Sequence, residues 1–199
     1  MNTLSQVCVF CGSSKGNDEN YISSAKELGS ILGKKDITMI YGGASVGLMG
    51  AAALACKDSN GTVIGVITET LREMGVSAEI CDELIITKSM HERKSQMSEM
   101  ADAFLILPGG IGTLEEFFEV FTWLQLGIMV KPIGILNING FYDLLFPFLD
   151  NMVQAGFLRQ DHLDMLIIST SPEELIEKLS QKEVTVLSKW FNVEENKIS

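Results

Sequence analysis

The sequence predicts an α/β protein of Rossmann type, with a doubly wound, mainly parallel sheet and helices on both faces. Two observations lead to this prediction. Short apolar runs alternate with helical patterns almost throughout the chain, an order typical of parallel strands joined by helices. Several runs, such as Phe104–Leu107 (F-L-I-L), are apolar at every position. Strands buried on both faces by covering helices have this composition.

The same patterns give each element a place in the chain. The expected strands are Gln6–Phe10, Ile37–Tyr41, Thr62–Ile67, Glu83–Ile86, Ala103–Leu107, Pro132–Leu136 and Met165–Ile168. The expected helices are Asp18–Lys34, Gly47–Lys57, Met90–Ala101, Thr113–Leu126, Phe141–Ala155 and Pro172–Leu179. Residues 68–82 form the longest connection without clear periodicity, which is typical of a mobile active-site loop. We expect one nucleotide-binding catalytic domain over residues 1–180 and a C-terminal tail over 181–199.

Composition and charge exclude several functions. The chain has 199 residues, of which 46% are hydrophobic and 21% charged, as in one globular domain. A net charge of −11 argues against binding to nucleic acid or an anionic membrane. We recognise neither a signal peptide nor a membrane span. Cys8 and Cys11 form a C-x-x-C inside an apolar run without a second such pair, so we expect reduced thiols in a cytoplasmic protein rather than a zinc site.

Glycine-rich segments follow three of the expected strands. They are Cys11–Gly16, Tyr41–Gly50 and Pro108–Thr113. Ligands of doubly wound sheets lie beyond the carboxyl ends of the strands, so these segments predict a nucleotide site. The glycines of the second segment have the spacing G-G-x-x-x-G-x-x-G rather than the dinucleotide fingerprint G-x-G-x-x-G. Close packing of a helix on a strand accounts for them equally well.

Leu107–Glu116 (L-P-G-G-I-G-T-L-E-E) is the most informative segment. A glycine turn that ends at a helix N-terminus presents unpaired N–H groups and a positive dipole end, which suit a phosphate. Two carboxylates, Glu115 and Glu116, follow in the first helical turn. The alternative is purely structural, because Thr113 and Glu116 also fit a capping box, with Thr113 at the helix start.

Ser89–Lys94 (S-M-H-E-R-K) is the second informative segment. Ser89 and Glu92 fit a capping box, and methionines 90, 97 and 100 share one helical face that is expected in the core. Arg93 and Lys94 are cations near a helix N-terminus, a placement that costs about 0.3–1 kcal/mol unless an anion lies opposite. A solvated charged turn is the alternative.

These two segments resemble the signatures of the LONELY GUY (LOG) family, P-G-G-x-G-T-x-x-E and M-H-x-R-K. The resemblance extends over F-C-G-S-S, Y-G-G-A-S-V-G-L-M-G and T-W-L-Q-L-G-I, from near the N-terminus to about Pro172. It implies a Rossmann-like homodimer that cleaves the N-glycosidic bond of a cytokinin riboside 5′-monophosphate, and commonly of AMP, to free base and ribose 5-phosphate. It implies neither a metal nor another cofactor. Many members carry the older label "lysine decarboxylase".

The resemblance also implies roles for individual residues. Arg93 and Glu116 are expected as the catalytic pair. The expected substrate contacts are Lys94, Gly109, Gly110, Ile111, Gly112, Thr113, Leu114, Glu115, Thr122, Gly43 and Met90. One departure concerns base recognition: relatives often have a glutamate where this chain has Gly75, and Glu73 or Glu79 is a possible substitute.

The residues also support a mechanism. Cleavage of a ribose–purine bond builds positive charge on the sugar, which an ionised Glu116 is suited to stabilise while it activates water. The main alternative function is a nucleotide-binding module without catalysis. A pyridoxal-phosphate lysine decarboxylase requires a Schiff-base lysine, and no sequence context supports one.

Overall fold

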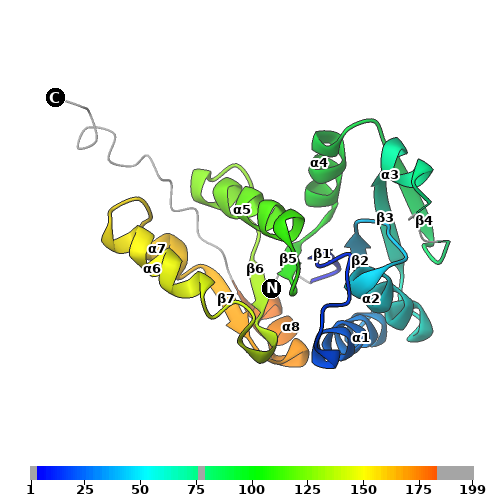
Figure 1. Cartoon of the computed structure of the whole chain (residues 1–199), viewed down its shortest axis with the longest axis horizontal. Coiled ribbons are helices and arrows are strands. Elements are labelled where there is room, and N and C mark those ends of the chain that lie inside the picture. The colour runs from blue at the N-terminus through cyan, green and yellow to red at the C-terminus, as the bar shows by residue number, and fades with distance from the viewer. Residues whose placement is uncertain (1–3, 76–78, 183–199) are drawn as a thin grey trace.

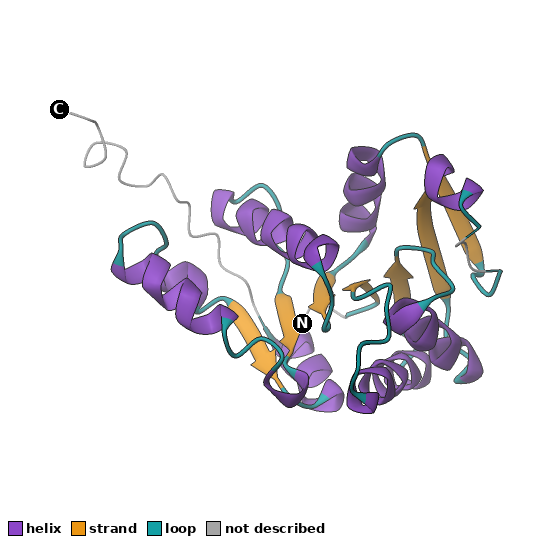
Figure 2. Ribbon diagram, in the orientation of Figure 1, coloured by secondary structure: helices purple, strands orange, loops and turns teal. Residues whose placement is uncertain are grey.

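The computed structural model describes residues 4–75 and 79–182, and it confirms the predicted Rossmann-like fold (Figures 1 and 2). Seven strands form one sheet in the order β4-β3-β2-β1-β5-β6-β7, and every pair of neighbours is parallel. The strands are β1 (Gln6–Phe10), β2 (Thr38–Tyr41), β3 (Val63–Thr68), β4 (Glu83–Thr87), β5 (Ala103–Ile106), β6 (Ile133–Leu136) and β7 (Leu166–Ser169).

Helices cover both faces of this sheet (Figure 1). One core lies beneath α1 (Glu19–Lys34), α2 (Gly47–Asp58) and α8 (Pro172–Gln181). The other lies beneath α4 (Met90–Met100), α5 (Ile111–Leu126), α6 (Leu145–Gln154) and α7 (Gln160–Leu163). The central strands therefore pack in both directions, and the four residues of β5 are all buried, which accounts for their uninterrupted apolar sequence.

Local sequence sets the ends of several helices. The Asp18 carboxylate accepts a hydrogen bond from the Asn20 N–H (2.9 Å) and caps α1. Ser89 caps α4 through the Glu92 N–H at 3.2 Å, but the Glu92 carboxylate bonds the Lys88 N–H rather than that of Ser89. The predicted reciprocal capping box is therefore only half formed. Its remaining bond still fixes where α4 begins, and so where Arg93 lies.

The strand order reverses beside β1, which lies between β2 and β5. The chain moves in one direction from β1 to β4 and in the other from β5 to β7. The loops after β1 and β5 therefore leave the sheet toward opposite faces and open a crevice, the usual ligand position in this class of fold. All three predicted glycine-rich loops follow the adjacent strands β2, β1 and β5.

Two helix predictions were wrong in their first residues. The helix expected from Thr113 begins at Ile111, with Gly110 as its N-cap. The helix expected from Phe141 begins at Leu145, because the 3-10 turn η1 (Ile138–Gly140) and a further turn come first. Asn139 has a positive φ of 49° in η1, a conformation that asparagine tolerates better than most residues.

Two short helices have no counterpart in the predictions. One is α3 (Glu69–Glu73), which occupies the start of the long connection, and the other is α7. Both are shorter than two helical turns, too short to show a hydrophobic period. Residues 76–78 of the long connection and 183–199 of the predicted tail lie outside the described residues.

Candidate active site

The three glycine-rich loops contact one another directly at the switch point. The Gly12 N–H donates to the Pro108 carbonyl (3.0 Å), and the Leu48 N–H donates to the Gly12 carbonyl (3.0 Å). A side chain on Gly47 would overlap the Ser13 backbone, and one on Gly109 would overlap Thr113. The loops after β1, β2 and β5 thus form one packed floor for the crevice.

The N-terminus of α5 faces outward from this floor. Its N-cap, Gly110, has no side chain to bond the first helical N–H groups, and these groups lack intrahelical partners in any helix. An added Cβ on Gly110 or Gly112 would meet nothing within 4 Å. The helix start therefore presents a positive dipole end and open backbone, which suit an anion.

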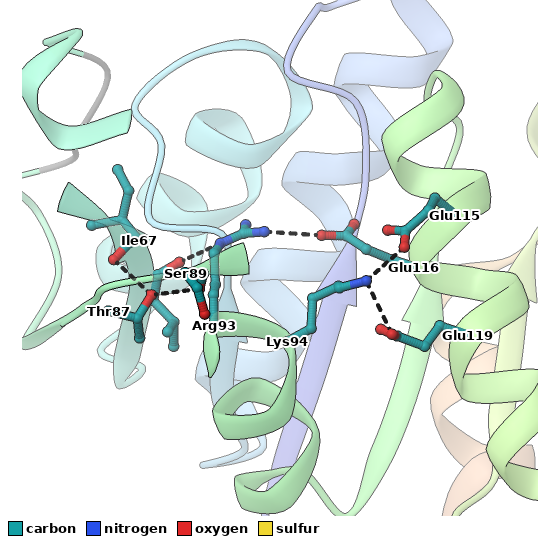
Figure 3. Close-up of polar contacts among 9 residues, drawn as sticks. Ile67, Thr87, Ser89, Arg93, Lys94, Glu115, Glu116 and Glu119 are labelled. Carbon is teal, nitrogen blue, oxygen red and sulfur yellow. Dashed lines mark hydrogen bonds and ion pairs between the residues drawn. The ribbon is translucent and has the colours of Figure 1, made fainter. Parts of the chain in front are cut away.

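The capping-box interpretation of Thr113 and Glu116 is wrong. Thr113 is the third residue of α5 and is 3% exposed. The Glu116 carboxylate instead accepts a hydrogen bond from Arg93 (Nη1 to Oε1, 3.2 Å), as Figure 3 shows. Glu116 is thus not committed to the end of its own helix, and its carboxylate lies between α5 and α4.

Arg93 is held from two further sides. It comes from the first turn of α4, and its Nε donates to the carbonyl of Val66 in β3 (2.8 Å). A side chain on Gly42, directly after β2, would overlap the guanidinium. The Arg93 side chain is 7% exposed and that of Glu116 13%. The alternative of a solvated charged turn is therefore wrong for Arg93.

Burial and charge act in opposite directions on Glu116. Burial raises the pKa of its carboxyl group, and the adjacent Arg93 offsets only part of this effect. A buried carboxylate with a raised pKa binds a proton more readily than an exposed one. This property is expected of a group that removes a proton from water.

Lys94 joins the same two helices on the neighbouring side (Figure 3). Its ammonium donates to Glu115 (2.6 Å) and to Glu119 (3.0 Å), and its side chain is 7% exposed. Burial would lower the pKa of Lys94, but the bonds to the two carboxylates outweigh it and raise the pKa. Sequence reasoning missed Glu119, although its spacing of four residues from Glu115 places both on one helical face.

The structure does not bring every predicted contact to this cluster. The Thr122 hydroxyl donates to the Phe118 carbonyl (2.6 Å) well beyond the first turns of α5. Gly43 packs against Ile67 and Leu84. Met90 is 46% exposed at the start of α4, whereas Met97 is fully buried, so the predicted apolar methionine face is wrong at Met90.

Two further predicted contacts, Ile111 and Leu114, lie at the start of α5. Ile111 is 82% exposed at the helix start, and Leu114 is partly buried against the core. Gly75, the departure from the family pattern, has a φ of +75° just after α3. Roles in substrate binding for these residues stay predictions. Gly42 lies in the second glycine-rich segment, but the sequence did not predict its contact with Arg93, because a glycine directly after a strand is equally typical of an ordinary turn.

The fold and the site define a Rossmann-like α/β protein in which an open helix N-terminus and a buried arginine–glutamate pair share one crevice. Residues 49–179 match the family model described as "Possible lysine decarboxylase". The chain is 46% identical over 176 residues to the cytokinin riboside 5′-monophosphate phosphoribohydrolase LOG of Oryza sativa subsp. japonica, covering 88% of this chain and 73% of the relative. It is 42% identical to LOG3 of Arabidopsis thaliana, with 88% and 82% covered. The chain therefore belongs to the LOG family.

Solved structures of lower identity share the fold. The molybdenum cofactor binding protein of Rippkaea orientalis matches with a TM-score of 0.67 and 22% identity, covering 89% of this chain and 96% of that one. The molybdenum cofactor carrier protein of Chlamydomonas reinhardtii matches with a TM-score of 0.66 and 20% identity, covering 89% and 97%. At these identities the likeness shows the fold alone.

Three further properties concern the described part of the chain. In residues 4–75 and 79–182, no group of three or more His, Cys, Asp or Glu side chains is arranged to hold a metal ion. Over the same ranges, no helix combines the length and apolar character needed to cross a membrane. Cys8, Cys11 and Cys56 are buried free thiols, and Cys81 is a partly buried one.

Proposed function

We propose that this protein is a phosphoribohydrolase that cleaves the N-glycosidic bond of a cytokinin riboside 5′-monophosphate, or of AMP, to free base and ribose 5-phosphate. The observation that carries the proposal is the buried Arg93–Glu116 pair beside the open start of α5. Relatives at 42–46% identity carry this activity in their names, and the residues of both family signatures meet at this site.

The phosphate binds at the start of α5 in this proposal. Gly110 and Gly112 leave the backbone N–H groups accessible, and the helix dipole favours the negative charge. The binding energy of this remote group fixes the sugar in a reactive position, because it is available without any change at the reacting bond. Among the other predicted loop contacts, Gly109 and Thr113 pack against each other and maintain the shape of the loop. Ile111 is exposed at the edge of the loop.

Glu116 acts on the sugar. Positive charge develops at the anomeric carbon as the base leaves, and a nearby carboxylate stabilises that charge. The same carboxylate orients the attacking water and accepts its proton. An arginine side chain is not a proton donor in proteins, so the role proposed for Arg93 is to hold Glu116 and the sugar hydroxyls in place.

Lys94 does not fit the Schiff-base lysine that a pyridoxal-phosphate decarboxylase needs. Such a lysine must lose its proton, which a lowered pKa favours. Lys94 instead contacts two carboxylates that raise its pKa. The description "Possible lysine decarboxylase" therefore finds no support in the chemistry of this side chain.

A single incubation tests the proposed function. The protein is mixed separately with AMP and with isopentenyladenosine monophosphate, and free base and ribose 5-phosphate are measured. We expect both products from at least one nucleotide, and much slower cleavage of the corresponding nucleosides. Tight AMP binding without product would indicate a non-catalytic nucleotide-binding module. Equal cleavage of nucleosides would contradict the role of the phosphate.

We also propose that the protein acts as a homodimer in the cytoplasm. Large apolar side chains stay exposed near α5 and α6, among them Ile111 (82%), Leu144 (89%) and Phe157 (80%). Their burial against a second copy supplies a driving force for association. Light scattering in solution is expected to give twice the mass of one chain. The cytoplasmic location follows from the cysteine pattern and is checked by cell fractionation.

A further inference from the structure

Tyr142 reaches from the segment after β6 to the base of the glycine loop. Its hydroxyl donates to the carbonyl of Leu107 at 2.6 Å. Leu107 comes directly after β5 and directly before Pro108, where the chain leaves the sheet to form the loop. Tyr142 is 3% exposed and packs within the core beneath α5. A side chain outside both family signatures therefore contacts the start of the predicted phosphate loop.

The turn after β6 is shaped to bring Tyr142 into this position. Asn137 is 8% exposed, and its side-chain carbonyl accepts from the Tyr142 N–H (2.8 Å) while its amide donates to Asp143 (2.8 Å). Asn139 and Gly140 have positive φ values of 49° and 70°. These interactions replace the helix predicted at Phe141 and turn the aromatic ring back toward β5.

Other anchors of the loop base come from a different direction. The Leu107 N–H donates to the Phe10 carbonyl of β1 (2.9 Å), and the Pro108 carbonyl accepts from Gly12 (3.0 Å). Both of these bonds tie the loop to β1 and the segment after it. Tyr142 supplies an anchor from the β6 side, so the loop base is held between its two neighbouring strands.

A phenylalanine would fill the space of the Tyr142 ring equally well. The buried hydroxyl carries a desolvation cost that only a hydrogen bond offsets. Burial also raises the pKa of the Tyr142 phenol, so the hydroxyl keeps its proton and donates a hydrogen bond at neutral pH. The hydroxyl therefore contributes a directional hydrogen bond rather than packing volume. This bond fixes the Leu107 carbonyl, which precedes the loop.

We propose that Tyr142 is a positioning residue that sets the geometry of the 5′-phosphate loop through the Leu107 carbonyl. The proposal rests on the function proposed above, because it assigns a consequence for phosphate binding. Without the hydroxyl, the loop base loses its anchor on the β6 side. The backbone N–H groups at Gly110 and Gly112 then spend less time in the arrangement that binds phosphate.

The test is Tyr142→Phe, compared with Tyr21→Phe as a matched control. Tyr21 packs edge-on against Phe141 at 5.6 Å between ring centroids, and the control also removes one phenolic hydroxyl. For Tyr142→Phe we expect KM for AMP to rise about 3- to 10-fold, the effect of one hydrogen bond. The inhibition constant of inorganic phosphate should rise by a similar factor, while kcat and the rate with adenosine change little. The control should leave all four values unchanged.

Two outcomes would overturn the proposal. One is a lower Tm for Tyr142→Phe with unchanged KM and unchanged phosphate inhibition, which would mean a structural role alone. The other is an equal loss with AMP and adenosine. Asn137→Ala, which releases the Tyr142 N–H, provides a second variant and should shift KM in the same direction. If the wild-type protein cleaved no nucleotide, the proposed function would fail, and calorimetric AMP affinity of the same variants would still test Tyr142.

Discussion

The loops after β2 and β5 are both rich in glycine and both lead into a helix, yet the structure uses them differently. In the first loop, side chains on Gly47 and Gly50 would overlap the backbone of Ser13 and Ser45. In the second, side chains on Gly110 and Gly112 would meet nothing. Close packing accounts for the first pair, whereas the second pair keeps backbone accessible. A glycine therefore leaves its backbone accessible to a ligand only where the space beside it is empty.

The helices that follow differ as well. The one acidic residue of α2 is Asp58 at its last position, and the five buried residues of this helix are all small or apolar. α5 carries Glu115, Glu116 and Glu119, which contact two cations of α4. This difference supports the proposal that the chemistry belongs to the loop after β5, whose helix brings carboxylates to a buried arginine. Variants that affect one loop and not the other can test this conclusion.

Glu116→Gln should cause the greatest loss of activity. The amide keeps the size of the side chain but neither accepts a proton nor stabilises a cation. We expect kcat with AMP to fall about 10²- to 10⁴-fold, with a folded protein by circular dichroism. Glu27→Gln, an exposed change on α1, is the control and should keep the wild-type rate. Near-normal turnover by Glu116→Gln would remove the catalytic role of this residue.

The two loops themselves are compared by Gly47→Ala and Gly112→Ala. Gly47 has a φ of +62° and no room for a Cβ, so we expect the free energy of unfolding to fall by about 2–4 kcal/mol. Gly112→Ala should leave stability unchanged or raise it by up to about 1 kcal/mol. It should also raise KM for AMP on the order of 10-fold, as an added methyl group crowds the phosphate.

Thermal unfolding and steady-state kinetics of both variants give the answer. A stable Gly47→Ala protein with weakened AMP binding would contradict the division of roles between the loops. Opposite effects, with stability lost in one loop and substrate affinity lost in the other, would support it.

A shift in pH dependence should be the most modest effect. Because burial raises the pKa of Glu116, kcat/KM should fall on the acid side at a pH above the ordinary glutamate value of 4.5. Arg93 opposes this shift, so Arg93→Met should move the acid limb to still higher pH in its residual activity. For stability the sign is the reverse of an ordinary salt bridge. The raised pKa favours the folded state at low pH, and this contribution is lost as pH rises through the folded-state pKa.

The measurement is a pH–rate profile for wild type and for Arg93→Met. Glu92→Gln, which removes an exposed carboxylate on α4, is the control and should leave the pH of the acid limb unchanged. An acid limb below 4.5 in the wild-type protein would show that Glu116 is not the group that titrates.

Much of the fold was predictable from the sequence, because buried parallel strands and capped helices leave local patterns. β1 was predicted to the residue, and α1, α2 and α8 to within two residues at either end. Element ends failed where tertiary contacts override local preference. Thr113 fits a helix cap by sequence, but Thr113 is buried beside Gly109, and α5 begins at Ile111 with Gly110 as its N-cap. The turn after β6 depends on the side chain of Asn137, which no periodicity reveals.

In the candidate site, too, the sequence predicted individual residues better than contacts between distant segments. Arg93, Lys94, Glu115 and Glu116 could be predicted because the family signatures specify them. In the structure Arg93 contacts Glu116, and Lys94 contacts Glu115. The sequence could not reveal the contact of Gly42 with Arg93 or that of Tyr142 with Leu107. Each contact joins segments more than 30 residues apart along the chain. Contacts of that kind become visible only after the sheet has brought the strands together.

The contact between Gly42 and Arg93 has a consequence for mutational tolerance. Position 42 contributes no functional group, yet even one methyl group there would displace the guanidinium that holds Glu116. The site therefore depends on the absence of a side chain at position 42, which leaves room for the Arg93 guanidinium. A survey of substitutions should find position 42 as intolerant as position 93, and a redesign that altered only reactive side chains would overlook it.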